Sequence, residues 1–293
     1  MNDNPFFTVI IPVYNRASII EKTIQSVLQQ EITDFELILI DDGSTDESLK
    51  ILKNEERSDE RIKVIALDEN QGRCFARNTG LENANGQWIC YLDSDDIYYP
   101  NHLSAMAEMI KTNNTFKAFA VDQDINGEIK KYKNKKIHED NLILDIYNFI
   151  EDNPLTANQL CHSSSLNVKW SEERIPISED LLFLRNVSLR TPIFKRSITT
   201  TNLIDHDDRT MNSANAEDFT KYNIIAAKKF INDSNISLKL ERRILCHTNL
   251  LCVNLLLNSG NKKDAFQLFK PNLTNLYSYK YILFYKAIIK FFV

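Results

Sequence analysis

Long apolar runs are missing from this sequence, and no stretch approaches the ~20 apolar residues that a membrane-spanning helix requires. The first residues, Met1 to Asn4, lack the positive start and the apolar run of a secretory signal peptide. The composition is 43% hydrophobic, which supplies a core for a chain of 293 residues. We therefore expect a folded protein that works in the cytoplasm.

Cysteine and glycine are both scarce, and their placement excludes several kinds of site. The five cysteines are scattered without the CxxC spacing of a zinc ribbon or a redox site, so they are expected to be buried thiols. No GxGxxG follows an apolar run and no GxxxxGK[ST] occurs, which argues against a dehydrogenase and a P-loop enzyme. Gly43, Gly72 and Gly86 lie in turns beside polar motifs, where a ligand can approach the backbone.

Strand and helix patterns alternate over the first hundred residues. Apolar runs of strand length occupy residues 7–14, 35–40, 61–67 and 88–92, and segments with helical spacing separate them. This order predicts a doubly wound parallel sheet of the α/β class. Ligands bind beyond the carboxyl ends of the strands in such sheets, and a polar cluster follows each of the four runs.

The rest of the chain is expected to complete this domain and then to become helical. Short strands are predicted at 118–121 and 191–194, and helices at 142–150 and 180–189. Further helices are predicted at 214–232, 238–258 and 262–269. We therefore expect a mixed α/β domain over residues 1–211, in two halves at 1–117 and 118–211, and a helical region over residues 212–293.

Three carboxylates, Asp93, Asp95 and Asp96, lie within four residues after the fourth strand. Carboxylates placed this close repel one another. A hard cation such as Mg²⁺ or Mn²⁺ removes this repulsion when it binds them and diphosphate oxygens complete its coordination shell. The alternative is a solvated turn or a helix start, where Asp is common. In the acidic turn after the second strand, Asp42 can accept a hydrogen bond from the N–H of a pyrimidine base, or the turn can simply cap a helix through Ser44.

Four segments, at residues 8–16, 40–46, 70–80 and 91–96, resemble in order the motifs of family 2 glycosyltransferases with the GT-A fold. The resemblance implies that one sugar moves with inversion from a nucleotide-diphosphate sugar, most often a UDP-sugar, with the help of Mg²⁺ or Mn²⁺. It also implies that residues 1–117 bind the nucleotide sugar and that residues 118–211 bind the acceptor.

The resemblance gives roles to the matching residues. Asp42 would read the base, Asp95 would bind the metal directly, and Asp93 would lie nearer the ribose. Arg77 would face the diphosphate or support the carboxylate cluster, although a pair of helical arginines such as Arg73 and Arg77 is more often solvated. The predicted donor and metal residues are Pro12, Val13, Tyr14, Asn15, Arg16, Asp42, Gly72, Arg77, Asp93, Ser94 and Asp95.

The acceptor side is predicted from the pair Glu179 and Asp180, which resembles the family's Glu-Asp pair. Asp180 is expected to act as the general base that takes the proton of the acceptor hydroxyl. Ordinary negative charge at the start of a helix is the alternative for both residues.

Three more side chains complete the predicted site. His206 is expected to complete the metal shell, and a surface histidine is the alternative. His162 and Trp170 are expected to line the acceptor site, Trp170 by stacking on a sugar, although a tryptophan packed in the core is more frequent.

The tail from Tyr277 to Val293 combines aromatics and lysines on a short apolar helix. This composition is typical of an anchor at a membrane surface, or of a helix docked on the core or on a second subunit. We expect a polysaccharide or lipid-linked glycan as acceptor, peripheral contact with the inner face of the cell membrane, and no nucleic-acid partner. Transfer to a polyprenyl phosphate, or a catalytically silent nucleotide-binding or assembly protein, stay open as alternatives.

Overall fold

The computed structural model describes residues 4–129, 141–151, 155–204 and 215–274, together with residues 284, 286–288 and 290. The chain divides into two compact units. The first comprises Met1–Ile146, Pro154–Arg174 and Val187–Asp205, and the second comprises Tyr147–Asn153, Ile175–Asn186 and His206–Val293. The second unit thus includes two stretches that the sequence prediction placed in the first domain.

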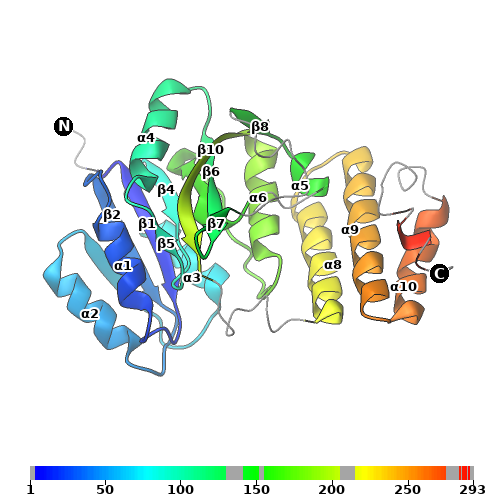
Figure 1. The fold of residues 1–293 in the computed structure, drawn as a ribbon, viewed down its shortest axis with the longest axis horizontal. Coiled ribbons are helices and arrows are strands. Elements are labelled where there is room, and N and C mark those ends of the chain that lie inside the picture. Colours follow the sequence, from blue (N-terminus) through cyan, green and yellow to red (C-terminus); the bar gives the residue numbers. More distant parts are fainter. Residues whose placement is uncertain are drawn as a thin grey trace. The chain divides into compact units, whose positions relative to one another are not determined.

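The strands of the first unit form one sheet. They are β1 (Phe7–Val13), β2 (Phe35–Asp41), β3 (Ile62–Ala66), β4 (Trp88–Tyr91), β5 (Ile97–Tyr98), β6 (Ala118–Ile125), β7 (Glu128–Ile129), β8 (Leu142–Leu144), β9 (Leu160–Ser163) and β10 (Ile193–Leu203). Their order is β3-β2-β1-β4-β9-β6-β10-β5, with β7 beside β6 and β8 beside β10 (Figure 1). Strands β1 to β4 are parallel, and β9 runs antiparallel between β4 and β6. The predicted α/β class is confirmed, with the order of strands reversing between β1 and β4.

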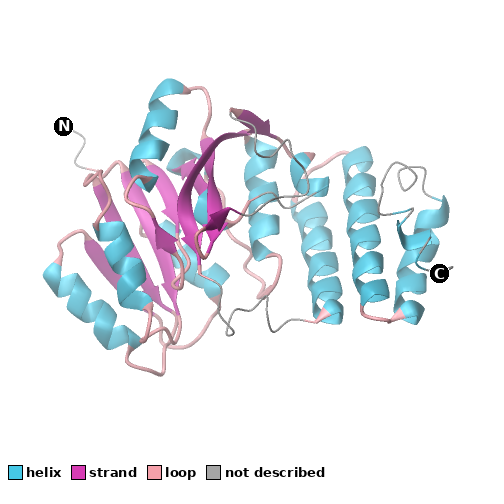
Figure 2. Ribbon diagram, viewed as in Figure 1, coloured by secondary structure: helices cyan, strands magenta, loops and turns pink. Residues whose placement is uncertain are grey.

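Helices lie on both faces of this sheet (Figure 2). They are α1 (Ile20–Leu28), α2 (Ser48–Ser58), α3 (Arg73–Glu82) and α4 (His102–Thr112), with the short turns η2 (Ala157–Gln159) and η3 (Ser164–Leu166). Helices α1, α2 and α4 share a core with alternate residues of β1 and β2. Helix α3 packs on the opposite face, where a Cβ added to Gly80 would lie 2.6 Å from Cγ2 of Ile10. Because both faces are covered, all seven residues of β1 are buried.

The cysteines occupy the cores of both units. Cys90 and Cys161 face each other across β4 and β9. Cys74 lies on α3, and Cys246 and Cys252 lie in the second unit. All five thiols are free and buried, as predicted.

The helix predicted over residues 142–150 is wrong. Leu142–Leu144 forms β8, which pairs antiparallel with β10, and only the short helix α5 (Asn148–Glu151) follows it. The helical spacing was misleading because pairing with the neighbouring strand outweighed local preference. The structure also contains β5 and β9, which the sequence did not predict.

The second unit is helical. It contains α5, the start of α6 (Glu179–Arg190), α8 (Ala216–Asp233), α9 (Leu238–Asn258), α10 (Lys262–Phe269) and η4 (Lys270–Thr274). Helix α9 packs against both α8 and α10, and its Leu250 and Val253 share a core with Phe269. The three helices predicted after residue 212 are therefore confirmed. Within the described residues, no helix has the length and apolar character needed to span a membrane.

Candidate functional site

The turn that follows β4 carries the predicted metal ligands. Three hydrogen bonds hold its backbone. The amide of Asp93 donates to Oδ1 of Asn158 at 2.9 Å, and Thr23 donates its hydroxyl to the carbonyl of Ser94 at 3.0 Å. Within the turn, the amide of Asp96 donates to the carbonyl of Asp93 at 3.1 Å. The turn is therefore fixed before any ligand binds. It lies beside β1, at the point where the order of the strands reverses.

Two arginines approach the carboxylates of this turn. Nη2 of Arg77 lies 2.6 Å from Oδ1 of Asp93, and Nη2 of Arg16 lies 3.6 Å from Oδ2 of Asp95. Arg77 is 1% exposed, so the ion pair balances a charge that is otherwise removed from water. The structure thus brings together four residues that come from separate motifs, Arg16, Arg77, Asp93 and Asp95.

These residues fit a divalent cation with a diphosphate. Carboxylates are the ligands that Mg²⁺ and Mn²⁺ prefer, and such ions are often held by one or two carboxylates with phosphate oxygens. Within the described part of the chain, no three His, Cys, Asp or Glu side chains lie close enough to hold a metal by themselves. Nε of Arg16 is buried and has no hydrogen-bond partner among the described residues.

Asp42 lies in a second turn, after β2. Its two carboxylate oxygens accept the backbone amides of Gln71 at 2.8 Å and of Gly72 at 2.9 Å. Burial raises the pKa of Asp42, while these two amides and the nearby charge of Arg174 act in the opposite direction. Gly72 therefore contacts Asp42 through its amide, and it lies directly before α3 with a φ of 94°, which favours glycine.

The segment after β1 faces the same turn. Pro12 and Val13 are buried, whereas the ring of Tyr14 is 41% exposed. Asn15 has a φ of 52°, and its amide donates to the hydroxyl of Ser44 at 3.0 Å. Helix α2 begins at Ser48, directly after Glu47, whose side chain makes no capping hydrogen bond, so the cap through Ser44 predicted for this turn is wrong.

His162 and Trp170, predicted at the acceptor site, are placed inside the first unit. His162 is 1% exposed, and its ring nitrogens contact the hydroxyl of Tyr91 and the carbonyl of Ser163, each at 3.0 Å. Trp170 is 2% exposed and packs on Tyr91 and Arg77. Their acceptor role stays a prediction, and their contacts are those of core residues.

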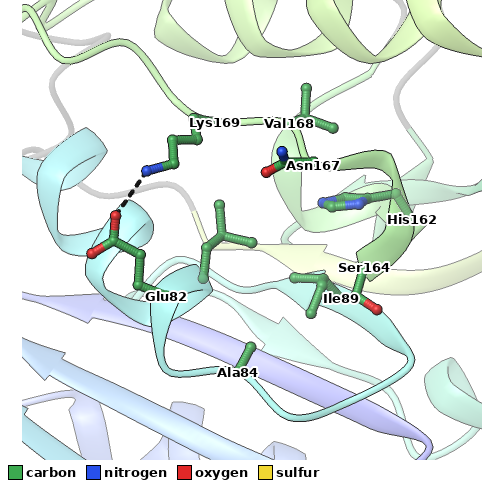
Figure 3. A pocket seen from close by; sticks show the side chains of 9 residues that line it. Glu82, Ala84, Ile89, His162, Ser164, Asn167, Val168 and Lys169 are labelled. Carbon is green, nitrogen blue, oxygen red and sulfur yellow. Dashed lines mark hydrogen bonds and ion pairs between the residues drawn. The ribbon is translucent and has the colours of Figure 1, made fainter.

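His162 also lines a pocket of about 180 Å³. Figure 3 shows it with Ile89 and Val168, near the ion pair that joins Lys169 to Glu82 at 2.9 Å. Ile89 lies near the start of β4, whereas Asp93 follows the end of that strand. The pocket is therefore separate from the turn at residues 93–96 that carries the predicted metal ligands, which we call the metal turn.

Glu179 and the predicted general base Asp180 are the first two residues of helix α6, in the second unit. Ser178, directly before the helix, has a φ of 70°, which a residue with a Cβ rarely adopts. Glu179 is buried and Asp180 is half-buried. Strained backbone of this kind is often kept where a site requires it.

Some predicted residues lie outside the described part of the chain, and some contacts in the structure were not predicted. His206 and most of the tail from Tyr277 to Val293 lie outside the described residues. Two contacting residues carry no signal in the sequence: Asn158, which accepts the amide of Asp93, and Arg174, whose Nη2 donates to Oδ1 of Asn70 at 2.8 Å. No motif marks either residue, because each reaches the site from a distant part of the sequence.

Two solved structures share this fold. S. aureus TarS 1–349 in complex with UDP-GlcNAc covers 96% of this chain and 79% of its own, with a TM-score of 0.67 and 22% identity. The mannosyltransferase PcManGT from Pyrobaculum calidifontis, in complex with GDP-Man and Mn²⁺, covers 99% and 86%, with a TM-score of 0.63 and 14% identity. These likenesses show a GT-A fold.

Curated relatives match part of the chain. The Escherichia coli UDP-Glc:alpha-D-GlcNAc-diphosphoundecaprenol beta-1,3-glucosyltransferase WfgD is 40% identical over 113 residues, which are 38% of this chain and 44% of that protein. The Campylobacter jejuni GalNAc(5)-diNAcBac-PP-undecaprenol beta-1,3-glucosyltransferase is 36% identical over 36% of this chain and 34% of its own. The chain thus spans less than half the length of these relatives. The family model described as Glycosyl transferase family 2 matches residues 8–175, which is more than half of the chain, and the chain therefore belongs to that family.

Proposed function

We propose that this chain transfers a sugar from a UDP-sugar to a hydroxyl of a polysaccharide or lipid-linked glycan, with inversion at the anomeric carbon. The observation that carries the proposal is the pairing of Asp93 with Arg77 and of Asp95 with Arg16 at the end of β4. Two carboxylates and two guanidinium groups in one place suit a metal ion and a diphosphate together.

In this proposal, Asp95 and Asp93 hold Mg²⁺ or Mn²⁺, and His206 completes the shell. The metal, when bound, stabilises the negative charge of the departing nucleotide diphosphate. Arg77 and Arg16 add fixed positive charge beside the same oxygens. Each of these groups acts on the leaving group.

The base and ribose are proposed to bind between the ends of β1 and β2. Tyr14 is 41% exposed there, and we assign Pro12, Val13, Asn15 and Ser94 to the same part of the site. Each oxygen of Asp42 accepts one amide and keeps a lone pair that can accept the N–H of uracil. The UDP-GlcNAc complex of TarS supports a uridine nucleotide as donor.

The acceptor chemistry is assigned to the start of α6. Asp180 takes the proton of the acceptor hydroxyl as that oxygen attacks the anomeric carbon, and the bond to the diphosphate breaks in the same in-line step. Glu179 supports it from the same turn. The names of WfgD and of the Campylobacter enzyme support a sugar on a lipid diphosphate as the acceptor.

Calorimetry tests the donor site. UDP, GDP and CDP are titrated with and without Mn²⁺ into wild type, Asp95→Ala and the control Asp34→Ala, which alters an exposed carboxylate before β2. We expect UDP to bind only with Mn²⁺, and Asp95→Ala to abolish this binding while Asp34→Ala leaves it unchanged. A folded wild type that binds none of the nucleotides would overturn the proposal in favour of an assembly protein.

A further inference from the structure

Asp96 differs from the other two carboxylates of the metal turn. Its side chain is fully buried at 0% exposed and faces Asn158, which is 2% exposed. Nδ2 of Asn158 donates to Oδ2 of Asp96 at 2.6 Å, and the amide of Ile204 donates to Oδ1 of Asp96 at 3.0 Å. A buried carboxylate needs such donors, because burial without hydrogen bonds is strongly unfavourable.

The same asparagine also holds the turn that carries Asp93. Oδ1 of Asn158 accepts the amide of Asp93 at 2.9 Å. The hydrogen bonds thus form one continuous chain from Asp93 through Asn158 and Asp96 to Ile204, and we call these residues the Asp96 chain. It joins the end of β4, the turn η2 and the residue that follows β10.

The direction of every bond in the Asp96 chain is fixed. The backbone amides of Asp93 and Ile204 can only donate, so the amide oxygen of Asn158 must face Asp93 and its nitrogen must face Asp96. An asparagine at position 96 would present an amide nitrogen where Asn158 already presents one. The chain therefore requires a carboxylate at one position and an amide at the other.

We propose that Asn158 and Asp96 are positioning residues that set the Asp93 turn for metal and diphosphate. Neither side chain is proposed to touch the donor. Asn158 fixes the backbone of Asp93, and Asp96 fixes the orientation of Asn158 by accepting from it and from Ile204. This inference rests on the proposed function, since it concerns the same metal turn.

Gln159, the neighbour of Asn158, shows what a buried side chain with a purely structural role looks like. Gln159 lies on the same turn η2 and is also fully buried, but its Nε2 donates to the carbonyl of Val121 at 2.7 Å and its Oε1 accepts the amide of Thr156 at 2.9 Å. Neither of these bonds reaches the Asp93 turn. Gln159→Glu should therefore lower stability without changing metal binding.

The test is a reciprocal exchange. In Asp96→Asn alone, two amide nitrogens face each other, and in Asn158→Asp alone, two carboxylates do. In the double variant Asp96→Asn with Asn158→Asp, each acceptor of the Asp96 chain faces a donor again. We expect each single variant to weaken binding of UDP with Mn²⁺ by about 10- to 100-fold, as removal of groups that orient metal ligands typically does. The double variant should recover most of that loss.

Three measurements are made on each folded variant: UDP and Mn²⁺ affinity by calorimetry, thermal midpoint, and hydrogen exchange at the amides of Asp93 and Ile204. Exchange at both amides should rise in the single variants and fall again in the double variant, whereas in Gln159→Glu it should rise by no more than the loss of global stability explains. The inference would be overturned if the single variants bound UDP with Mn²⁺ as tightly as wild type, or if the double variant bound no more tightly than the weaker-binding single variant. Either result would leave the proposed function intact. A wild type that binds no nucleotide would instead remove the proposed function.

Discussion

The guanidinium of Arg77 is shared between Asp93 and Trp170. Its Nη2 lies 2.6 Å from Oδ1 of Asp93, and its central carbon lies 4.1 Å from the centre of the Trp170 ring. A planar cation can make both contacts at once, whereas an ammonium group can make only the ion pair well. The orientation of Asp93 therefore depends on the shape of this side chain as well as on its charge.

Arg77→Lys is expected to weaken binding of UDP with Mn²⁺ about tenfold or more and to lower the free energy of unfolding by about 1–3 kcal/mol. The matched control is Arg61→Lys, because Arg61 also pairs with a carboxylate, Asp59 at 2.7 Å, and lies 4.6 Å over Phe35. That pair is partly exposed, so its loss should change stability by less than about 1 kcal/mol. Equal effects of the two substitutions on UDP affinity and on urea unfolding would contradict the prediction.

Gly43 is expected to be intolerant of a side chain. It has a φ of 68°, and an added Cβ would lie 2.5 Å from the carbonyl carbon of Glu69. Gly127 has a φ of 84° but no atom within 4 Å of its added Cβ, so it isolates the effect of the backbone conformation. We expect urea unfolding to show a loss of roughly 1 kcal/mol for Gly127→Ala and more than about 2 kcal/mol for Gly43→Ala. Similar losses would show that the contact with Glu69 does not matter.

Stability of the first unit should fall in mild acid because of His162. Burial lowers the pKa of His162 to about 4, from an ordinary value of 6.5. Above pH 6.5 the ring is neutral in both folded and unfolded chains, and between pH 6.5 and 4 only the unfolded chain gains the proton. Its contribution to stability is thus complete above pH 6.5 and is lost by up to about 3 kcal/mol as the pH falls to 4.

Urea unfolding at pH 7, 6 and 5, followed by tryptophan fluorescence, measures this loss, because Trp88 and Trp170 both lie in the first unit. His162→Gln should flatten the dependence on pH. An unchanged slope in that variant would assign the acid sensitivity to other groups, such as His102, whose pKa burial lowers to about 3.

Asp180→Asn is expected to lower transfer to a saccharide hydroxyl by ~10²–10⁴, while UDP affinity stays the same. Asp218→Asn is the control, since Asp218 is a half-buried aspartate in the first turn of α8. Release of UDP from the donor in the presence of acceptor gives the rate. Full activity in Asp180→Asn would favour a polyprenyl phosphate acceptor, whose oxygen needs no base.

The parallel half of the sheet was predictable from the sequence. Helices cover both faces of its strands, so strands such as β1 are apolar along their whole length and stand out as long apolar runs. The turn with Asp93 and Asp95 was predictable because only Ser94 separates the two aspartates in the sequence. The contacts of Asn158 and Arg174 were not, since they depend on the turn η2 and on a loop that return from distant residues. Residues 142–144 became a strand for the same reason: the partner strand decided their conformation.

The buried thiols have a practical consequence. A thiol reacts with an alkylating reagent as its thiolate, and burial raises the pKa of Cys161 and raises that of Cys252 to about 12. Alkylation must therefore wait for the surrounding structure to open. Cys90 and Cys161 would report opening of the sheet, and Cys246 and Cys252 opening of the helical unit. Rates of labelling with and without UDP would then show whether the donor steadies one unit or both.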